Sequence, residues 1–325
     1  MPIITKDMVH PELRKKVRLK KTGKEKYSLV KTKIMKKLCR FLRGKHNKKM
    51  MYKQEYIERP DGSKLRICVY TPLEHKENVP GLLWMHGGGY AIGVPEQDDL
   101  YILNFVEASG CVVVSPDYTL SLDKPYPAAL EDCYATLLWL RDNGETYGMR
   151  SDQIFVGGNS AGGGLAAAVS LYARDKGEVA IAFQIPLYPM LDDRPTNSST
   201  DNNDPVWSSV SNVASWKLYL GDLYGSDEIP IYAAPSRAEN LSGLPPALSY
   251  VGNLDPFHDE NVTFFEKLKT HGVHVDFKVF DGCFHAFDQL HRDTEISKEA
   301  IYFLMEKYMF AVSNFFAPQK DGDQE

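Results

Sequence analysis

Short apolar runs alternate with longer stretches of helical periodicity along most of this 325-residue chain. The runs have the length of buried strands, and the stretches between them place apolar residues at three- and four-residue steps. Strands that alternate with helices in this way are typical of an α/β fold, in which helices flank a mostly parallel central sheet. We expect strands at 56–58, 65–70, 82–85, 112–115, 154–157, 182–187, 247–251 and 275–280, and helices at 128–141, 161–174, 259–271 and 295–316.

The chain divides into two parts of opposite charge. Residues 1–53 hold 19 Lys and Arg against 3 Asp and Glu, a net charge of +16, whereas the rest of the chain carries −21. Within the basic part, Ser28 is a candidate N-cap. Apolar residues follow it at helical spacing and predict a basic amphipathic helix: Val30, Ile34, Leu38 and Leu42. This stripe is apolar enough that we expect it to be buried.

The domain organisation follows from the same patterns. Residues 1–53 form a basic N-terminal segment, residues 54–318 carry the α/β pattern, and residues 319–325 form a polar tail. Residues 192–242 interrupt the pattern with a polar, loop-rich stretch that contains one helix around 210–220. We interpret this stretch as an insertion above the sheet.

Several classes of protein are excluded by what the chain lacks. No apolar run approaches the ~20 residues of a membrane span, and the N-terminus has no apolar signal core, so we expect a cytoplasmic protein without stable membrane insertion. Five scattered cysteines indicate reduced thiols, and the absence of CxxC and HExxH predicts no metal. The phosphate-binding patterns GxGxxG and GxxxxGK both fail, so we expect neither a nucleotide nor another cofactor.

Ser160 is the first candidate for chemistry. It lies in Gly158-Asn159-Ser160-Ala161-Gly162, a GxSxG motif between an expected strand and an expected helix. Glycines two residues away on each side permit a turn that exposes the hydroxyl, and the next backbone N–H, that of Ala161, falls at a helix N-terminus, where it can stabilise an oxyanion. This context favours a nucleophile over a merely glycine-rich helix start.

A second glycine motif, His86-Gly87-Gly88-Gly89-Tyr90, follows the strand expected at 82–85. Consecutive glycines leave backbone N–H groups free to face a substrate, as an oxyanion hole requires.

A serine nucleophile needs a base and an orienting carboxylate. Asp255 follows the strand at 247–251 and His285 follows the strand at 275–280, so both are expected at the same sheet edge as Ser160. The order Ser, Asp, His is that of α/β-hydrolases. Asp259, next to His258, is the second choice for the acid.

The segments HGGGY, GNSAGG, DPFHDE and GCFHAF resemble the bacterial hormone-sensitive lipase family of α/β-hydrolases, over roughly residues 54–318. The resemblance implies an eight-stranded sheet, a cap built from the N-terminal segment and the insertion, and hydrolysis of short-acyl esters without a cofactor. By position, Ser160 resembles the nucleophile, His285 the base and Asp255 the acid, and the oxyanion donors are Gly87, Gly88 and Ala161. Two departures are Asn159, where the family usually has Asp, and His258, where it more often has Arg.

The sequence therefore predicts a serine carboxylesterase that hydrolyses acetyl to butyryl esters of small molecules through an acyl-enzyme. Aromatic residues near the oxyanion loop and in the insertion suggest a narrow pocket: Tyr90, Trp207 and Trp216. A deacetylase or amidase would use the same residues, and a non-catalytic ligand-binding hydrolase fold is a further alternative. The basic segment could also suit an adapter for membranes or nucleic acid, but it lacks interleaved aromatics, so we expect no nucleic-acid partner and assign the segment to the cap. A homo-oligomer is left open.

Overall fold

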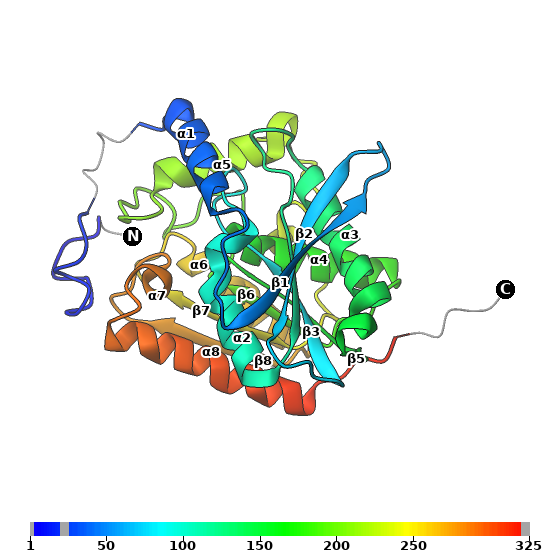
Figure 1. Ribbon diagram of the computed structural model, residues 1–325. Coiled ribbons are helices and arrows are strands. Elements are labelled where there is room, and N and C mark those ends of the chain that lie inside the picture. The colour runs from blue at the N-terminus through cyan, green and yellow to red at the C-terminus, as the bar shows by residue number, and fades with distance from the viewer. Residues whose placement is uncertain (1–2, 20–25, 320–325) are drawn as a thin grey trace.

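The computed structural model describes residues 3–19 and 26–319 and contains one eight-stranded sheet (Figure 1). The strands lie in the order β1-β2-β4-β3-β5-β6-β7-β8. β2 is antiparallel to both β1 and β4, and the other neighbours are parallel. The sheet is therefore mostly parallel, as the sequence predicted. The strands are β1 Met50–Glu58, β2 Lys64–Pro72, β3 Val79–Met85, β4 Val112–Pro116, β5 Met149–Asn159, β6 Phe183–Leu187, β7 Ala247–Gly252 and β8 Val275–Phe280.

Helices cover both faces of this sheet (Figure 1). Successive side chains of a strand point to opposite faces, so Leu82 and Leu83 of β3 enter different apolar cores. The core that contains Leu83 is closed by α3 and α4, and the core that contains Leu82 is closed by α2 and α8. The helices are α1 Leu29–Cys39, α2 Asp99–Ser109, α3 Ala128–Asn143, α4 Ala161–Lys176, α5 Ser209–Leu220, α6 His258–Thr270, α7 Phe287–Leu290 and α8 Glu295–Asn314.

Two elements differ from the sequence prediction. β1 begins at Met50, so the boundary expected between residues 53 and 54 falls inside a strand that pairs with β2 along its whole length. The helix α2 was not predicted, because its buried apolar residues lie on more than one face: Tyr101, Ile102, Leu103, Phe105 and Val106. No helix in the described ranges is long and apolar enough to cross a membrane. The five cysteines are free, as predicted.

The N-terminal residues before α1 form part of the core, which the sequence did not reveal. Ile4, Val9 and Leu13 are buried with residues near the carboxyl end of β8. The backbone N–H of His10 donates to the carbonyl of Gly282 at 2.8 Å, and the amide side chain of Asn203, in the insertion, binds the backbone of Ile4. This segment therefore joins the insertion to the loop after β8.

The predicted basic helix is present as α1, and the Ser28 hydroxyl accepts a hydrogen bond from the N–H of Lys31 at its start. The expectation that its apolar stripe is buried is wrong, because α1 contains no buried residue and Val30, Ile34 and Leu38 are 67%, 53% and 50% exposed. Periodicity identifies such a stripe without determining which way it faces. The insertion carries α5 where a helix was expected, and the tail after Gln319 lies outside the described residues.

Candidate active site

Ser160 lies in the sharp turn between β5 and α4. Its φ of +56° is in the left-handed region, a strained conformation for a residue with a side chain. The flanking glycines make the turn possible, because a Cβ at Gly158 would lie 2.5 Å from the carbonyl oxygens of Met85 and Gly162, and one at Gly162 would lie 2.1 Å from that of Met85. The turn directs the Ser160 hydroxyl towards the loops at the carboxyl ends of the strands.

Three predicted residues form one hydrogen-bonded chain there. His285 Nε2 lies 2.9 Å from Ser160 Oγ, and His285 Nδ1 lies 2.7 Å from Asp255 Oδ2. All three side chains are buried. Burial alone lowers the pKa of His285, but the charge of Asp255, the hydrogen bond to it, and the carboxylates of Asp204 and Asp288 together raise that pKa above its usual value.

The two alternatives near the acid have other partners. Asp259 Oδ2 accepts the backbone N–H of Ser198 at 2.8 Å, and its Oδ1 lies 2.9 Å from Nδ1 of His258. His258 thus pairs with its chain neighbour, and Asp255 rather than Asp259 is the carboxylate that contacts His285.

The candidate oxyanion donors border the nucleophile. A Cβ on Gly87 would lie 3.3 Å from the Ser160 Cβ, and the Gly87 carbonyl is held by the side chain of Gln97 at 3.1 Å. Gly88 has a φ of +123°, and Ala161 opens α4. Within the described ranges, the N–H groups of Gly87, Gly88 and Ala161 donate to no other residue. They are available to an oxyanion formed at Ser160.

Asn159, the departure from the family pattern, belongs to a buried polar cluster. Its side-chain Nδ2 donates to Asp98 Oδ2 at 2.5 Å, and Asp98 also accepts from Trp84 Nε1 and Gln289 Nε2, each at 2.9 Å. Burial raises the pKa of Asp98 to about 6, although these three donors oppose the shift. An amide at position 159 therefore supplies a donor that a carboxylate could not.

Asp204 is a site residue that the sequence analysis missed. Its Oδ2 accepts the backbone N–H of His285 at 2.8 Å, and its Oδ1 accepts the backbone N–H groups of Val206 and Trp207 at 2.7 and 2.9 Å. Burial, followed by the charge of Asp255, raises the pKa of Asp204 to about 7. One carboxylate of the insertion thus holds both the histidine and the tryptophan in position.

Only one of the three aromatic residues expected in the pocket lies beside the hydrogen-bonded chain of Ser160, His285 and Asp255. The Trp207 ring centroid is 6.2 Å from that of His285, and a Cβ on Gly89 would lie 2.2 Å from the Trp207 ring. Tyr90 and Trp216 are each about 1% exposed and pack with Tyr219, so the structure places them in the core. Their spacing in the sequence did not distinguish a pocket wall from a core contact.

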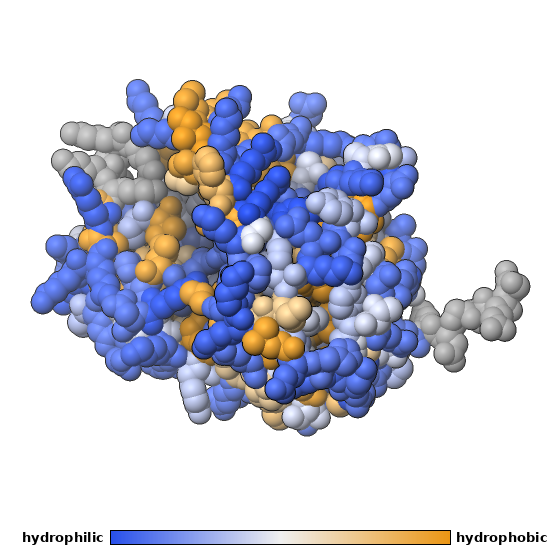
Figure 2. Space-filling model, viewed as in Figure 1, coloured by the Kyte–Doolittle hydropathy of each residue, from blue (hydrophilic) through white to orange (hydrophobic). Residues whose placement is uncertain are grey.

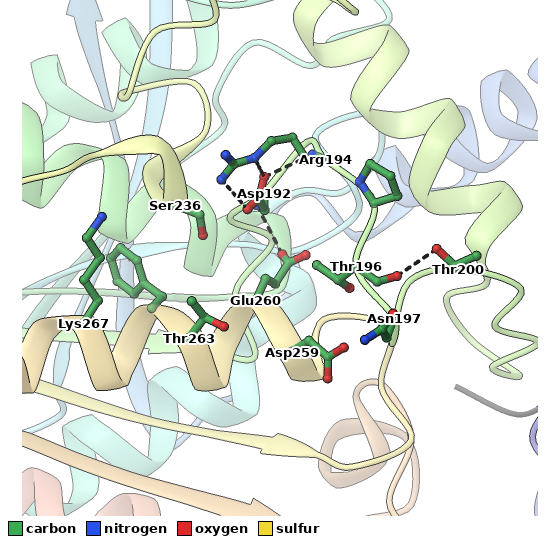
Figure 3. A pocket seen from close by; sticks show the side chains of 12 residues that line it. Asp192, Arg194, Thr196, Asn197, Thr200, Ser236, Asp259, Glu260, Thr263 and Lys267 are labelled. Atoms are coloured by element: carbon green, nitrogen blue, oxygen red, sulfur yellow. Dashed lines mark hydrogen bonds and ion pairs between the residues drawn. The ribbon is translucent and has the colours of Figure 1, made fainter.

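A cavity of about 470 Å³ lies beside the first turns of α6 (Figure 3). Its lining includes Asp259, Glu260 and Thr263 of α6 and the ion pair of Asp192 and Arg194. Glu260 accepts the backbone N–H of Asp192 at 3.4 Å. Ser160 is not among the lining residues, so this cavity is separate from the nucleophile. The described residues include no group of three or more His, Cys, Asp or Glu that could bind a metal.

Comparison with known proteins agrees with this geometry. A family model for the alpha/beta hydrolase fold matches residues 82–289. Esterase LipI of Mycobacterium tuberculosis is 36% identical over 61% of this chain and 62% of its own length, and an arylesterase of Saccharolobus solfataricus is 32% identical over 69% of this chain and 72% of its own. The solved structure of a bacterial heroin esterase superposes with a TM-score of 0.85 at 32% identity, over 95% of this chain and 99% of that one.

Proposed function

The chain belongs to the α/β-hydrolase fold family, and we propose that within it this protein is a serine carboxylesterase that hydrolyses short-chain acyl esters of small molecules. The observation that carries the proposal is the continuous chain from Asp255 through His285 to Ser160, with hydrogen-bond distances of 2.7 and 2.9 Å. Relatives named as esterases support the same reaction.

The geometry supports a role for each group in the proposed reaction. His285 Nε2 takes the proton from Ser160 Oγ as the oxygen attacks the ester carbonyl, and Asp255 holds the imidazole in position and stabilises the imidazolium. The N–H groups of Gly87, Gly88 and Ala161 donate to the oxyanion of the tetrahedral intermediate. Its collapse expels the alcohol, which receives the proton from His285, and leaves an acyl group on Ser160. Water, activated by the same histidine, then releases the acid.

Substitution of the nucleophile tests this mechanism. Ser160→Ala should lower the kcat for p-nitrophenyl acetate by several orders of magnitude, and Ser160→Ala/His285→Ala should be hardly worse, because the triad acts as a unit. Ser170→Ala is a matched control, since Ser170 is a buried serine of α4 whose hydroxyl binds only the carbonyl of Ala166. Retention of a tenth of the wild-type rate by Ser160→Ala would refute the assignment.

Trp207 supports the preference for short acyl groups. Its ring lies against Gly89 of the oxyanion loop and near His285. We propose that it limits the space for the acyl group of the substrate there. Wild type should hydrolyse p-nitrophenyl acetate and butyrate faster than palmitate, and Trp207→Ala should narrow that difference. If palmitate is the best substrate, the proposal of a short-chain esterase fails and a lipase becomes the better interpretation.

A deacetylase of an acylated small metabolite is the second candidate. The nearly full-length likeness to a protein named a heroin esterase favours it, and the same three residues would serve. A panel of acetylated alcohols and amides distinguishes the candidates by their relative kcat/KM. A non-catalytic ligand-binding role is disfavoured by the complete hydrogen-bonded chain, and an initial burst of p-nitrophenol from p-nitrophenyl acetate would exclude it.

A further inference from the structure

The polar side of helix α1 contacts the rest of the protein. Its less exposed residues recur at helical spacing and are Thr32, Lys36 and Cys39. Lys36 retains only 11% side-chain exposure and forms an ion pair with Asp123. The residues that follow the helix make further polar contacts. Arg43 forms an ion pair with Asp117 at 2.6 Å, and the Gly44 N–H donates to Glu96 at 2.7 Å. Polar contacts therefore hold the helix with its opposite side facing solvent.

That opposite side is apolar. Figure 2 shows a column of hydrophobic surface over α1, bordered by hydrophilic side chains. The residues of this outward stripe are between 37% and 70% exposed. They comprise Val30, Ile34, Met35 and Leu38 of α1, and Phe41 and Leu42 of the 3-10 turn Arg40–Leu42 that continues it. A water-soluble helix normally buries such a stripe, so a contiguous exposed one indicates a binding surface.

A cationic recess lies next to the stripe. A cavity of about 250 Å³ is lined by Lys33, Lys36, Lys37 and Arg40 together with Leu122 and Asp123. Asp123 is its one carboxylate and is paired with Lys36. Within the described part of the chain, Lys33, Lys37 and Arg40 form no ion pair. The recess therefore has unneutralised positive charge beside an apolar surface.

We propose that α1 docks this enzyme on an anionic phospholipid surface, with the outward stripe in the acyl boundary and the cationic recess on lipid phosphates. An apolar helix face flanked by Lys and Arg is suited to the interface between headgroups and acyl chains. A second copy of the chain is a poorer occupant, because it would bring its own basic helix against this one. Nucleic acid would neutralise the cations but leave the stripe in water. The proposal does not depend on the catalytic assignment.

Sedimentation of the full chain with lipid vesicles tests the stripe. The protein should sediment with vesicles of phosphatidylcholine and roughly 30% phosphatidylserine, and much less with phosphatidylcholine alone. Ile34→Gln/Leu38→Gln/Phe41→Gln should weaken binding by about tenfold or more, whereas Leu290→Gln/Tyr302→Gln, which removes exposed apolar groups from the C-terminal region, should bind as wild type does.

A second variant tests whether the cationic recess contributes to vesicle binding. Lys33→Gln/Lys37→Gln/Arg40→Gln should weaken binding to the anionic vesicles on the order of 100-fold, since each basic residue near such a surface contributes about a factor of five. Lys176→Gln/Lys269→Gln/Lys298→Gln, on α4, α6 and α8, removes the same number of exposed charges and is the control for net charge. All variants should keep the wild-type circular dichroism spectrum and the wild-type rate on p-nitrophenyl acetate, because none of the changed residues contacts Ser160 or His285.

Four results would overturn the proposal. The first is equally weak binding of wild type to neutral and anionic vesicles, and the second is binding of both triple variants at the wild-type level. The third is dimerisation of wild type in sedimentation velocity without vesicle binding, lost only in the stripe variant, which would identify a second copy as the occupant. The fourth is binding to a nucleic-acid duplex in preference to vesicles.

Discussion

Asn159→Asp restores the residue that the family usually has before the nucleophile, yet the structure predicts that it destabilises this protein. The new carboxylate would lie where the Asn159 amide now donates to Asp98 at 2.5 Å. Asp98 is fully buried and Asn159 is 2% exposed, so water cannot screen the two charges. The pair must therefore retain one proton at neutral pH.

The loss of folding free energy can be calculated for each of the two carboxyl groups that could keep that proton. Keeping it on the new carboxyl, whose unperturbed pKa is about 3.9, costs about 4 kcal/mol at pH 7 at 1.36 kcal/mol per pH unit. Keeping it on Asp98, whose pKa is about 6, costs only about 1 kcal/mol, but the new carboxylate is then buried and ionised. The pKa of Asp98 shows that burying a carboxylate here costs about 3 kcal/mol even with three donors. Both routes give a loss of about 4 kcal/mol.

The loss depends on pH with a definite sign. The new carboxyl has a folded pKa above its unfolded value, so its cost is absent below about pH 4 and grows as pH rises above the unfolded pKa. At pH 5 the same arithmetic gives about 1.5 kcal/mol. With an unfolding entropy of roughly 2.1 cal/mol/K per residue over 325 residues, 4 kcal/mol corresponds to a Tm lower by about 6 °C at pH 7.

Thermal unfolding followed by circular dichroism at pH 5, 6 and 7 measures this difference. Asn159→Ala removes the donor without adding a charge, so its deficit should change less with pH. Asp98→Asn/Asn159→Asp exchanges the amide and the carboxylate and should recover part of the lost stability. A Tm deficit of Asn159→Asp that is absent at pH 7, or equal at pH 5 and pH 7, would refute the reasoning.

The other predictions concern the carboxylates around the histidine. Asp255→Asn should lower kcat by roughly 10³–10⁴-fold with the fold intact, because an amide has no charge to stabilise the His285 imidazolium and no longer fixes the tautomer of the ring. Asp259→Asn should lower the Tm and leave kcat near wild type, since the amide keeps only one of the two oxygens that contact the Ser198 N–H and His258. Equal kinetic loss in both variants would contradict the assignment of the acid. Activity requires neutral His285, so kcat/KM should fall as pH falls through a histidine pKa above about 6.5. Asp204→Asn should move that acidic limb to lower pH, because the charge of Asp204 helps to raise the pKa of His285, and an unchanged pH profile would show that Asp204 acts only through its backbone contacts.

The hydrogen-bonded chain from Asp255 through His285 to Ser160 could be predicted because the motifs that form it are local in the sequence. Ser160, Asp255 and His285 each follow a strand that the apolar pattern reveals, and parallel strands bring their carboxyl ends to one edge. The glycines around Ser160 are required by contacts as short as 2.1 Å, so the motif and the turn imply one another. The sheet could be predicted for the same reason, since buried strands retain their apolar runs.

Asp204 could not be predicted in this way. It lies in a polar loop of the insertion among other Asp and Asn residues, and nothing in its neighbours indicates which carboxylate meets the His285 backbone. The prediction that Tyr90 and Trp216 line the pocket failed because an aromatic side chain fits a core and a pocket equally well. Contacts between residues far apart in the chain decide such cases, and no short pattern records them.

The N-terminal region contains two parts, residues 3–19 and α1, whose charge is similar but whose apolar residues face in different directions. Residues 3–19 and α1 share the same basic composition, which led to one cap segment in the sequence analysis. The first part buries Ile4, Val9 and Leu13 and binds Gly282, two residues before the loop reaches Phe284 and His285, so its removal acts on the histidine. The helix buries no apolar residue and is tied down by Lys36 and the residues that follow it, so its removal leaves the triad's contacts in place. A deletion of the whole region would mix the two effects, and only separate changes in each part can assign catalysis to one and surface binding to the other.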